Sequence, residues 1–223
     1  MSPDFCKAVD PVFLHVLGML DRIGRGQRLR YDDERMRITG YLAQAEGILG
    51  NTKDWELAKY ALVCWTDELL VDAEWEHRKR WTNQTLESEI YGGASLRYLK
   101  FYQKAEEASA LVRRDALETY YLCVVLGFQG LYRPACDAAD ESGRQYNIQQ
   151  ERLPPDRESW ARKTAMGIQY GQGRPVIPED TMNIAGAPPL EGPFMCIWSA
   201  FFGVVLATLL AIILWSFSQP TKL

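Results

Sequence analysis

Apolar residues recur every three or four positions along most of the first 150 residues, which is the spacing of one face of an α-helix. The first such stretch ends at the glycines of residues 24–26. Its apolar face is formed by Phe5, Val9, Val12, Val16, Leu20 and Ile23. A second helix is predicted from about Asp32 to Gly50, and a third from about Asp54 to Leu70.

Four more helical segments are predicted between residues 82 and 150. They are a short segment over 82–90, a helix around 96–102, a helix over 117–128, and a helix from Pro134 to about Gln150. No stretch alternates with a period of two residues, which would indicate strands. The pattern therefore predicts an all-α domain of about seven helices over residues 1–170.

The pattern changes after residue 170. Glycine and proline are concentrated in residues 171–193, which is typical of a linker. Residues 194–217 then form an uncharged, mostly apolar stretch that would rise about 36 Å as a helix, against about 30 Å of bilayer hydrocarbon. Trp198 and Trp215 lie near its two ends, where indole rings favour the membrane interface. We expect one transmembrane helix here.

The start of the chain indicates which side of the membrane the domain occupies. It has neither a basic start nor an unbroken apolar run, so it does not resemble a secretory signal peptide. We therefore expect a cytoplasmic helical domain, with residues 218–223 as a short tail on the far side of the membrane. A homodimer through the span stays open, since Gly203 is followed four residues later by Ala207 rather than by a second glycine.

Composition narrows the function classes. The net charge is −4, and nucleic-acid binding needs clustered Lys and Arg, so we expect no nucleic-acid partner. The five cysteines are irregularly spaced without a CxxC pair, which favours reduced thiols. The sequence contains no phosphate-binding loop, nucleophile elbow or zinc-ligand spacing. We therefore expect no enzyme activity and no cofactor.

Two acidic motifs are candidates for metal or acid–base chemistry. Glu74 and His77 have the spacing of a dimetal-bundle motif, but His15 has no matching glutamate, so a solvated pair at a helix end is the preferred interpretation. Asp67 and Glu68 could act as acid and base or bind a cation, although neighbours on a helix point about 100° apart. The simpler interpretation is that one carboxylate bonds backbone N–H groups or an arginine while the other meets solvent. A tail-anchored enzyme with an acidic metal site is kept as an alternative.

Tyr120, Tyr121, Phe128 and Tyr132 form an aromatic stripe. A stripe at helical spacing is by default part of the core, and a partner surface is the alternative interpretation.

Three blocks of the sequence resemble the DotU/TssL family of bacterial type VI and type IVB secretion systems. The first two, residues 58–68 and 81–101, contribute Trp65, Asp67, Glu68, Trp81, Gly92 and Gly93. The third, residues 117–133, contributes Tyr121, Gly127, Phe128, Gly130, Tyr132 and Arg133. The charged segment 76–80 departs from the family pattern, and no peptidoglycan-binding extension is expected after the span.

The resemblance implies a hook-like domain of two small helical bundles on the inner membrane. It also implies a scaffold role with an IcmF/TssM-like membrane partner, an outer-membrane lipoprotein reached indirectly, and the baseplate of a type VI system. The equivalent role in a type IVB system is the alternative. We expect Asp67 and Glu68, with the loop at Gly92 and Gly93, to organise the surface or cleft that partners contact. Gly127 and Gly130 are expected to permit close helix approach and a turn.

Overall fold

The computed structural model describes residues 1–92, 97–134, 138–171 and Thr208. Within these ranges it contains nine α-helices, one 3-10 turn and no strand, which confirms the all-α prediction. The elements are α1 (Pro3–Gly24), α2 (Tyr31–Leu49), α3 (Lys53–Asp72), α4 (Arg78–Asn83), α5 (Leu86–Tyr91), α6 (Arg97–Ser109), α7 (Asp115–Val125), η1 (Gly130–Tyr132), α8 (Ala138–Gln150) and α9 (Arg157–Gly171).

The predicted linker, span and tail lie outside the described residues, apart from Gly171 and Thr208. In the part of the chain that is described, no helix is long and apolar enough to cross a bilayer.

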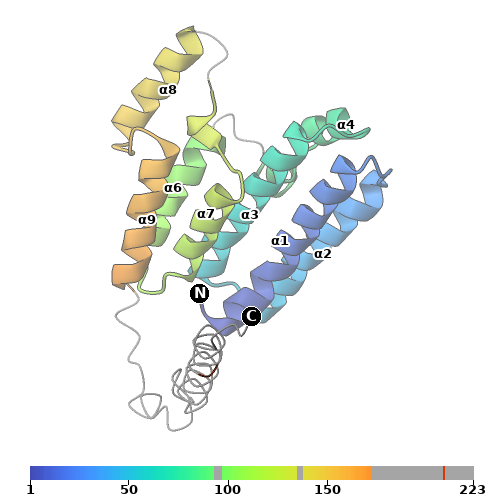
Figure 1. The fold of residues 1–223 in the computed structure, drawn as a ribbon, viewed down its shortest axis with the longest axis horizontal. Helices are drawn as coiled ribbons and strands as arrows, with labels where there is room; N and C mark the ends of the chain where they lie inside the picture. The colour runs from blue at the N-terminus through green and yellow to red at the C-terminus, as the bar shows by residue number, and fades with distance from the viewer. Residues whose placement is uncertain (93–96, 135–137, 172–207, 209–223) are drawn as a thin grey trace, which may run out of the picture. The chain divides into compact units, whose positions relative to one another are not determined.

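Helix α3 is the centre of the described domain (Figure 1). It begins at Thr52, whose hydroxyl accepts a hydrogen bond from the backbone N–H of Trp55 at 3.2 Å. Most of its residues are buried on all sides, as expected for a helix that is apolar around its circumference. Figure 1 shows α1 and α2 on one side of α3, and α6, α7 and α9 on the other. Two groups of helices therefore share α3.

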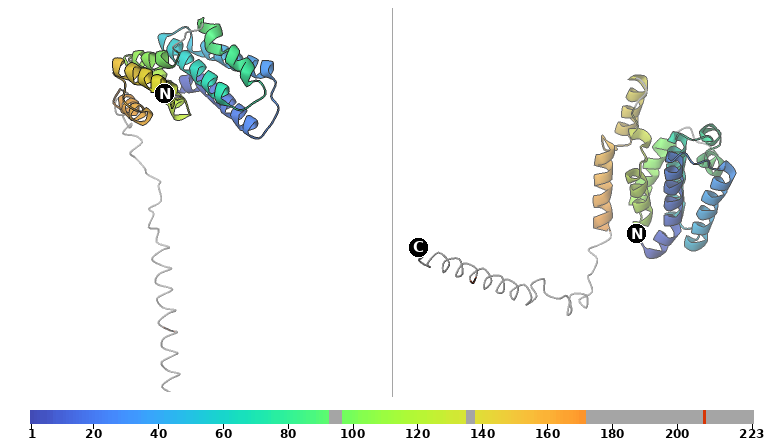
Figure 2. Two further views of the ribbon diagram at one scale, coloured as in Figure 1. Left: turned by 90° about the horizontal axis from the view of Figure 1, so that it is seen from above. Right: turned by 45° about the vertical axis from the view of Figure 1, so that its right-hand side comes forward.

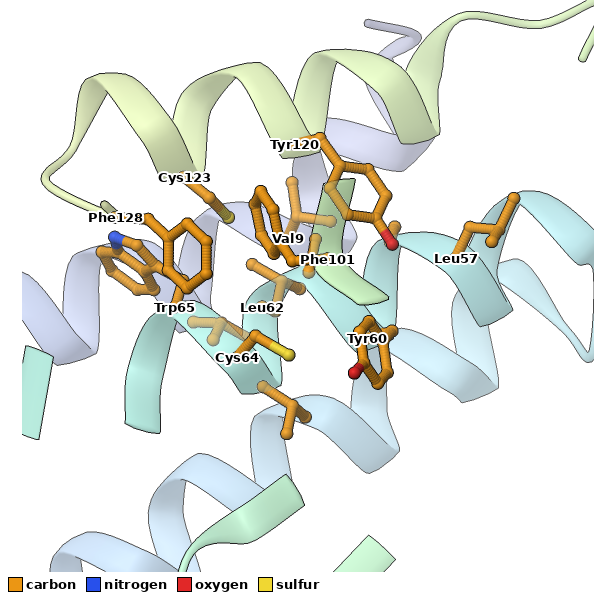
Figure 3. Packing of buried hydrophobic residues seen from close by; sticks show 14 of the residues in the cluster. Val9, Leu57, Tyr60, Leu62, Cys64, Trp65, Phe101, Tyr120, Cys123 and Phe128 are labelled. Atoms are coloured by element: carbon orange, nitrogen blue, oxygen red, sulfur yellow. The ribbon is translucent and has the colours of Figure 1, made fainter. Parts of the chain in front are cut away.

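Aromatic side chains pack with aliphatic and cysteine side chains in the core between α3, α6 and α7 (Figure 3). Phe101 stacks on Phe128 at 3.9 Å between ring centroids and meets Tyr120 edge to face at 4.8 Å. Trp65 donates its indole N–H to the carbonyl of Leu126 at 3.3 Å. Because Tyr120 and Phe128 are fully buried, the core interpretation of the aromatic stripe is confirmed for these two residues.

The other two aromatic residues of the stripe, Tyr121 and Tyr132, are half-buried at the edge of this core. The Tyr132 hydroxyl donates to the carbonyl of Pro154 at 2.8 Å, which holds the segment before α9 against η1.

Two glycines have the structural role that was expected of them. Gly127 has φ +113°, and a Cβ there would lie 3.3 Å from Leu69 Cδ2. Gly130 has φ +54°, and a Cβ there would lie 2.8 Å from the Phe128 ring. Both positions require glycine because the turn after α7 combines a left-handed backbone with close packing.

The helix count corrects the sequence prediction in two places. The segment predicted over 82–90 is two short helices, because Thr85 interrupts it and caps α5 by accepting from the N–H of Ser88 at 3.3 Å. Helix α9 was not predicted, since its buried apolar residues are sparse: only Trp160 and Ile168 are core members. Asp156 starts this helix by accepting from the N–H of Ser159 at 2.8 Å.

Candidate functional site

Asp67 is fully buried near the carboxyl end of α3 and holds α4 and α5 in place. Its Oδ1 accepts hydrogen bonds from the indole N–H of Trp81 and the backbone N–H of Leu86, both at 2.9 Å. Its Oδ2 accepts from the backbone N–H of Glu87 at 2.8 Å. The two backbone donors belong to the first turn of α5, where N–H groups have no partner within the helix. Asp67 therefore acts as a cap for a helix that follows it in the sequence.

Glu68 likewise accepts hydrogen bonds from backbone N–H groups, those of the turn at 129–130 on the other side of α3. Its Oε1 accepts from the backbone N–H of Gln129 at 2.7 Å, and its Oε2 accepts from that of Gly130 at 3.2 Å. Arg133 Nη2 lies 3.9 Å from Oε1. Burial raises the pKa of Glu68 above its usual range, although the two backbone N–H groups and Arg133 act in the opposite direction.

The two adjacent carboxylates thus bind two different segments, and we call this pair the α3 clasp. The expectation that one of them meets solvent is wrong: Asp67 is 0% exposed and Glu68 is 9% exposed. The physical reason is that α3 is covered on one side by α4 and α5 and on the other by α7, with the turn at 129–130 over Glu68. The two groups do not converge on a common atom, so their arrangement suits positioning rather than acid–base catalysis.

A cleft of about 290 Å³ opens beside Glu68. Its walls come from the end of α3, the start of α6, η1 with the residue after it, and α8. It is lined by Glu68, Val71, Asp72, Tyr98, Gly130, Arg133, Gly143, Arg144 and Asn147. Arg133 forms an ion pair with Asp72 across one wall. Because most of this lining is polar or charged, the cleft suits charged or hydrogen-bonding side chains of a protein rather than an apolar ligand.

Of the predicted glycine loop, the structure describes only the first residue. Gly92 ends α5 with φ +80°, and its N–H donates to the carbonyl of Ser88 at 3.1 Å. Gly93 lies outside the described residues. Gly92 is therefore linked to Asp67 through the short helix α5, whose first turn Asp67 caps.

Sequence reasoning missed the contacts that hold α4 against α2. The guanidinium of Arg80 lies 3.8 Å from the ring centre of Tyr31, and that of Arg35 lies 5.0 Å from the ring of Trp81. Arg80 also pairs with Asp32 at 2.7 Å. The charged run at 76–80, which departs from the family pattern, is the sequence signal for these contacts.

The interpretation of Glu74 and His77 as a solvated pair holds only for the glutamate. Glu74 is exposed, whereas His77 is half-buried. The His77 ring lies edge to face on Trp75 at 5.6 Å and on Tyr31 at 6.1 Å. Within the described ranges no group of three or more His, Cys, Asp or Glu side chains is placed to hold a metal ion.

A second buried polar cluster, also missed, joins α1 to α2. Glu34 accepts two hydrogen bonds from Arg22, at 2.9 Å and 3.1 Å, and its Oε2 lies 2.9 Å from Nε2 of His15. Burial lowers the pKa of His15 below its usual value, although Glu34 acts in the opposite direction. Nothing in the helical pattern distinguishes these residues from surface charges.

Comparison with known proteins identifies related sequences and folds. The family described as "Type VI secretion system protein DotU" matches residues 5–218, a range that includes the uncharged stretch 194–217. The cytoplasmic domain of TssL from Acinetobacter baumannii has a similar fold, with a TM-score of 0.56 and 19% sequence identity. The similarity covers 76% of this chain and 99% of that domain. No match is found among curated proteins.

Proposed function

Because the chain belongs to the DotU family of type VI secretion system proteins, we propose that it is a non-enzymatic scaffold of such a system at the inner membrane. In this role it joins an IcmF/TssM-like membrane protein and recruits the cytoplasmic baseplate, and it reaches an outer-membrane lipoprotein only indirectly. The observation that carries the proposal is the family match over residues 5–218. The family description names a type VI system, which favours that assignment over a type IVB system.

The apolar stretch supports the location that we propose. A family match that continues to residue 218 includes 24 consecutive residues without a charge. We propose that residues 194–217 anchor the protein as a single-pass helix and that residues 1–170 lie in the cytoplasm. The linker at 171–193 then separates the helical domain from the lipid surface.

The α3 clasp supports a docking role for the cleft beside it. Asp67 and Glu68 fix the positions of α5 and of the turn at 129–130 through hydrogen bonds to backbone N–H groups. A surface whose segments are held in this way presents the same shape to each partner, and less entropy is lost on binding. We propose that baseplate components contact the cleft lined by Tyr98, Arg133 and Asn147. In this proposal Asp67 acts only by holding α5, whereas Glu68 both holds the turn at 129–130 and lines the cleft.

This geometry determines how the docking role is tested. Reversing the charges of Asp67 and Glu68 would place buried cations against N–H donors and disturb the fold itself. Asn147→Arg is a better variant, because Asn147 lines the cleft and is half-buried at its edge. Tyr146→Arg is the matched control, since Tyr146 is exposed on the same helix and does not line the cleft.

The experiment is purification of the full-length protein from its native membrane in mild detergent, with partners identified by mass spectrometry. The wild-type chain and Tyr146→Arg are expected to recover an IcmF/TssM-like protein together with baseplate and sheath components. Asn147→Arg is expected to keep the membrane partner and lose the baseplate. Recovery of the baseplate with Asn147→Arg would remove the cleft from the proposal. Absence of all secretion components from the wild-type sample would overturn the scaffold role.

A further inference from the structure

A groove of about 870 Å³ runs between α6 and α9, and it shares no lining residue with the cleft beside Glu68. Helices α6 and α9 both pack against α7 (Figures 1 and 2), and α7 contributes Leu117 to the lining of the groove. The segment 151–154, Ser109 and Arg114 also line the groove.

The floor of this groove is apolar. It contains Leu117 of α7, which is 4% exposed, and Trp160 of α9, which is 5% exposed. Trp160 meets Tyr102 of α6 edge to face at 5.3 Å between ring centroids. Both side chains are already almost fully buried, so a partner would gain from packing its own apolar side chains on them rather than from covering them further.

The wall formed by α9 is one helix face with open space at Gly167. Trp160, Lys163, Thr164 and Gly167 line the groove at the i, i+3, i+4 and i+7 spacing of a single helix face. A Cβ added at Gly167 would have no atom within 4 Å, so the space above this glycine is open. The face is about 10 Å long, or two helical turns, which fits the recognition of an amphipathic helix by its apolar stripe.

Apolar surface continues beyond the groove along the same flank of α9. Met166 is 46% exposed and Tyr170 is 85% exposed, and both follow Lys163 at helical spacing. A small molecule inside the groove would leave these two side chains uncovered, whereas a helix lying along α9 would cover part of them.

The two walls carry opposite charges. Glu106 and Glu107 line the α6 side, and Lys163 lines the α9 side. Glu107 has Lys53 at 3.8 Å as a partner, whereas no ion pair to Glu106 or Lys163 occurs within the described ranges. A helix with basic residues on one flank of its apolar stripe and acidic residues on the other would match both walls.

We propose that this groove is a second docking surface, which takes an amphipathic helix of a partner protein. The apolar stripe of that helix lies over Leu117 and Trp160, its basic flank along Glu106 and Glu107, and its acidic flank along Lys163. This inference rests on the groove alone, and it holds whether or not the cleft beside Glu68 binds the baseplate.

The test measures binding of labelled synthetic helices to the full-length protein in nanodiscs by fluorescence anisotropy, with empty nanodiscs as the blank. Three peptides share one leucine stripe: the first has lysines on one flank and glutamates on the other, the second has lysines on both, and the third has glutamates on both. The mixed peptide is expected to bind about tenfold more tightly than either of the others. Replacing Glu106 and Glu107 by lysine should transfer this preference to the peptide with glutamates on both flanks.

A second pair of variants separates groove binding from other contacts. Gly167→Leu fills the open space, so it should abolish binding of the peptides. Because leucine has a higher helix propensity than glycine, the variant should keep its helical content. Gln169→Leu is the matched control, because Gln169 is exposed on α9 and does not line the groove. Equal binding of the three peptides, or binding that survives Gly167→Leu, would overturn the proposal. If the protein self-associates in sedimentation and Gly167→Leu abolishes this self-association, the groove binds a second copy of the chain. That result would overturn the proposal too.

Discussion

Replacing Asp67 with asparagine is expected to lower the free energy of unfolding by about 3 kcal/mol. The amide oxygen can take the place of Oδ1 and still accept hydrogen bonds from the N–H groups of Trp81 and Leu86. The amide nitrogen then faces the N–H of Glu87, which has lost its acceptor at 2.8 Å. A hydrogen bond to a charged group contributes about 1.5–3 kcal/mol, and a buried donor without a partner costs about 1–3 kcal/mol. The loss is large beside a typical domain stability of about 5–15 kcal/mol.

Urea unfolding of the full-length protein in mild detergent, followed by circular dichroism at the helix band, measures this loss. Asp72→Asn is the matched control, because Asp72 lies on the same helix but is half-exposed and pairs with Arg133 at the surface. Asp72→Asn should lower the free energy of unfolding by less than about 1 kcal/mol. Trp81→Phe combined with Asp67→Asn should lower stability by less than the sum of the two single changes, because Asp67→Asn already weakens the bond from Trp81 by replacing a charged acceptor with a neutral one.

The reasoning is refuted if Asp67→Asn and Asp72→Asn unfold at the same urea concentration. Such a result would mean that the Asp67 carboxylate is not the acceptor that holds α5 against α3. Additive losses in the double variant would likewise show that Asp67 and Trp81 act independently.

The remaining predictions use the same unfolding measurement. Glu68→Gln is expected to lower the free energy of unfolding by only about 1 kcal/mol, because burial already raises the pKa of Glu68 and an amide oxygen can accept from the N–H of Gln129. A loss as large as that of Asp67→Asn would contradict this expectation. Gly130→Ala should cost about 2–4 kcal/mol through its left-handed φ and its contact with Phe128, whereas Gly143→Ala, in an open helical position, should stabilise by up to about 1 kcal/mol. Burial lowers the pKa of His15 in the folded state, so the unfolded chain binds the proton first and stability is lost as pH falls through about 6.5. His15→Gln should reduce the difference in unfolding free energy between about pH 7.5 and about pH 5.5. An unchanged difference would show that His15 does not cause this pH dependence.

Helices with a continuous apolar stripe were predictable from the sequence. The first three predicted helices correspond to α1, α2 and α3, and their ends are marked by Gly24, Gly50 and the residues after Leu70. The period of 3.6 residues is a local property of the chain, and each of these helices buries one face or more against the others. The family blocks likewise contain the residues of the α3 clasp and the two glycines of the turn after α7.

Helices that depend on a few distant contacts were not predictable in this way. Helix α9 has only two core residues, and the first turn of α5 depends on Asp67, which accepts from backbone N–H groups 19 and 20 residues away along the chain. In both cases the tertiary contacts outweigh a weak local preference.

The sequence by itself determined that the described domain is helical, that Asp67 and Glu68 are neighbours on α3, and that residues 194–217 carry no charge. It did not determine what the two carboxylates bind. The donors to Asp67 are 14 to 20 residues away along the chain, and those to Glu68 are 61 or 62 residues away. Local periodicity contains no information over such separations. Only the packing of α4, α5 and the turn after α7 around α3 decided that both side chains are buried hydrogen-bond acceptors, since buried N–H groups must find a partner.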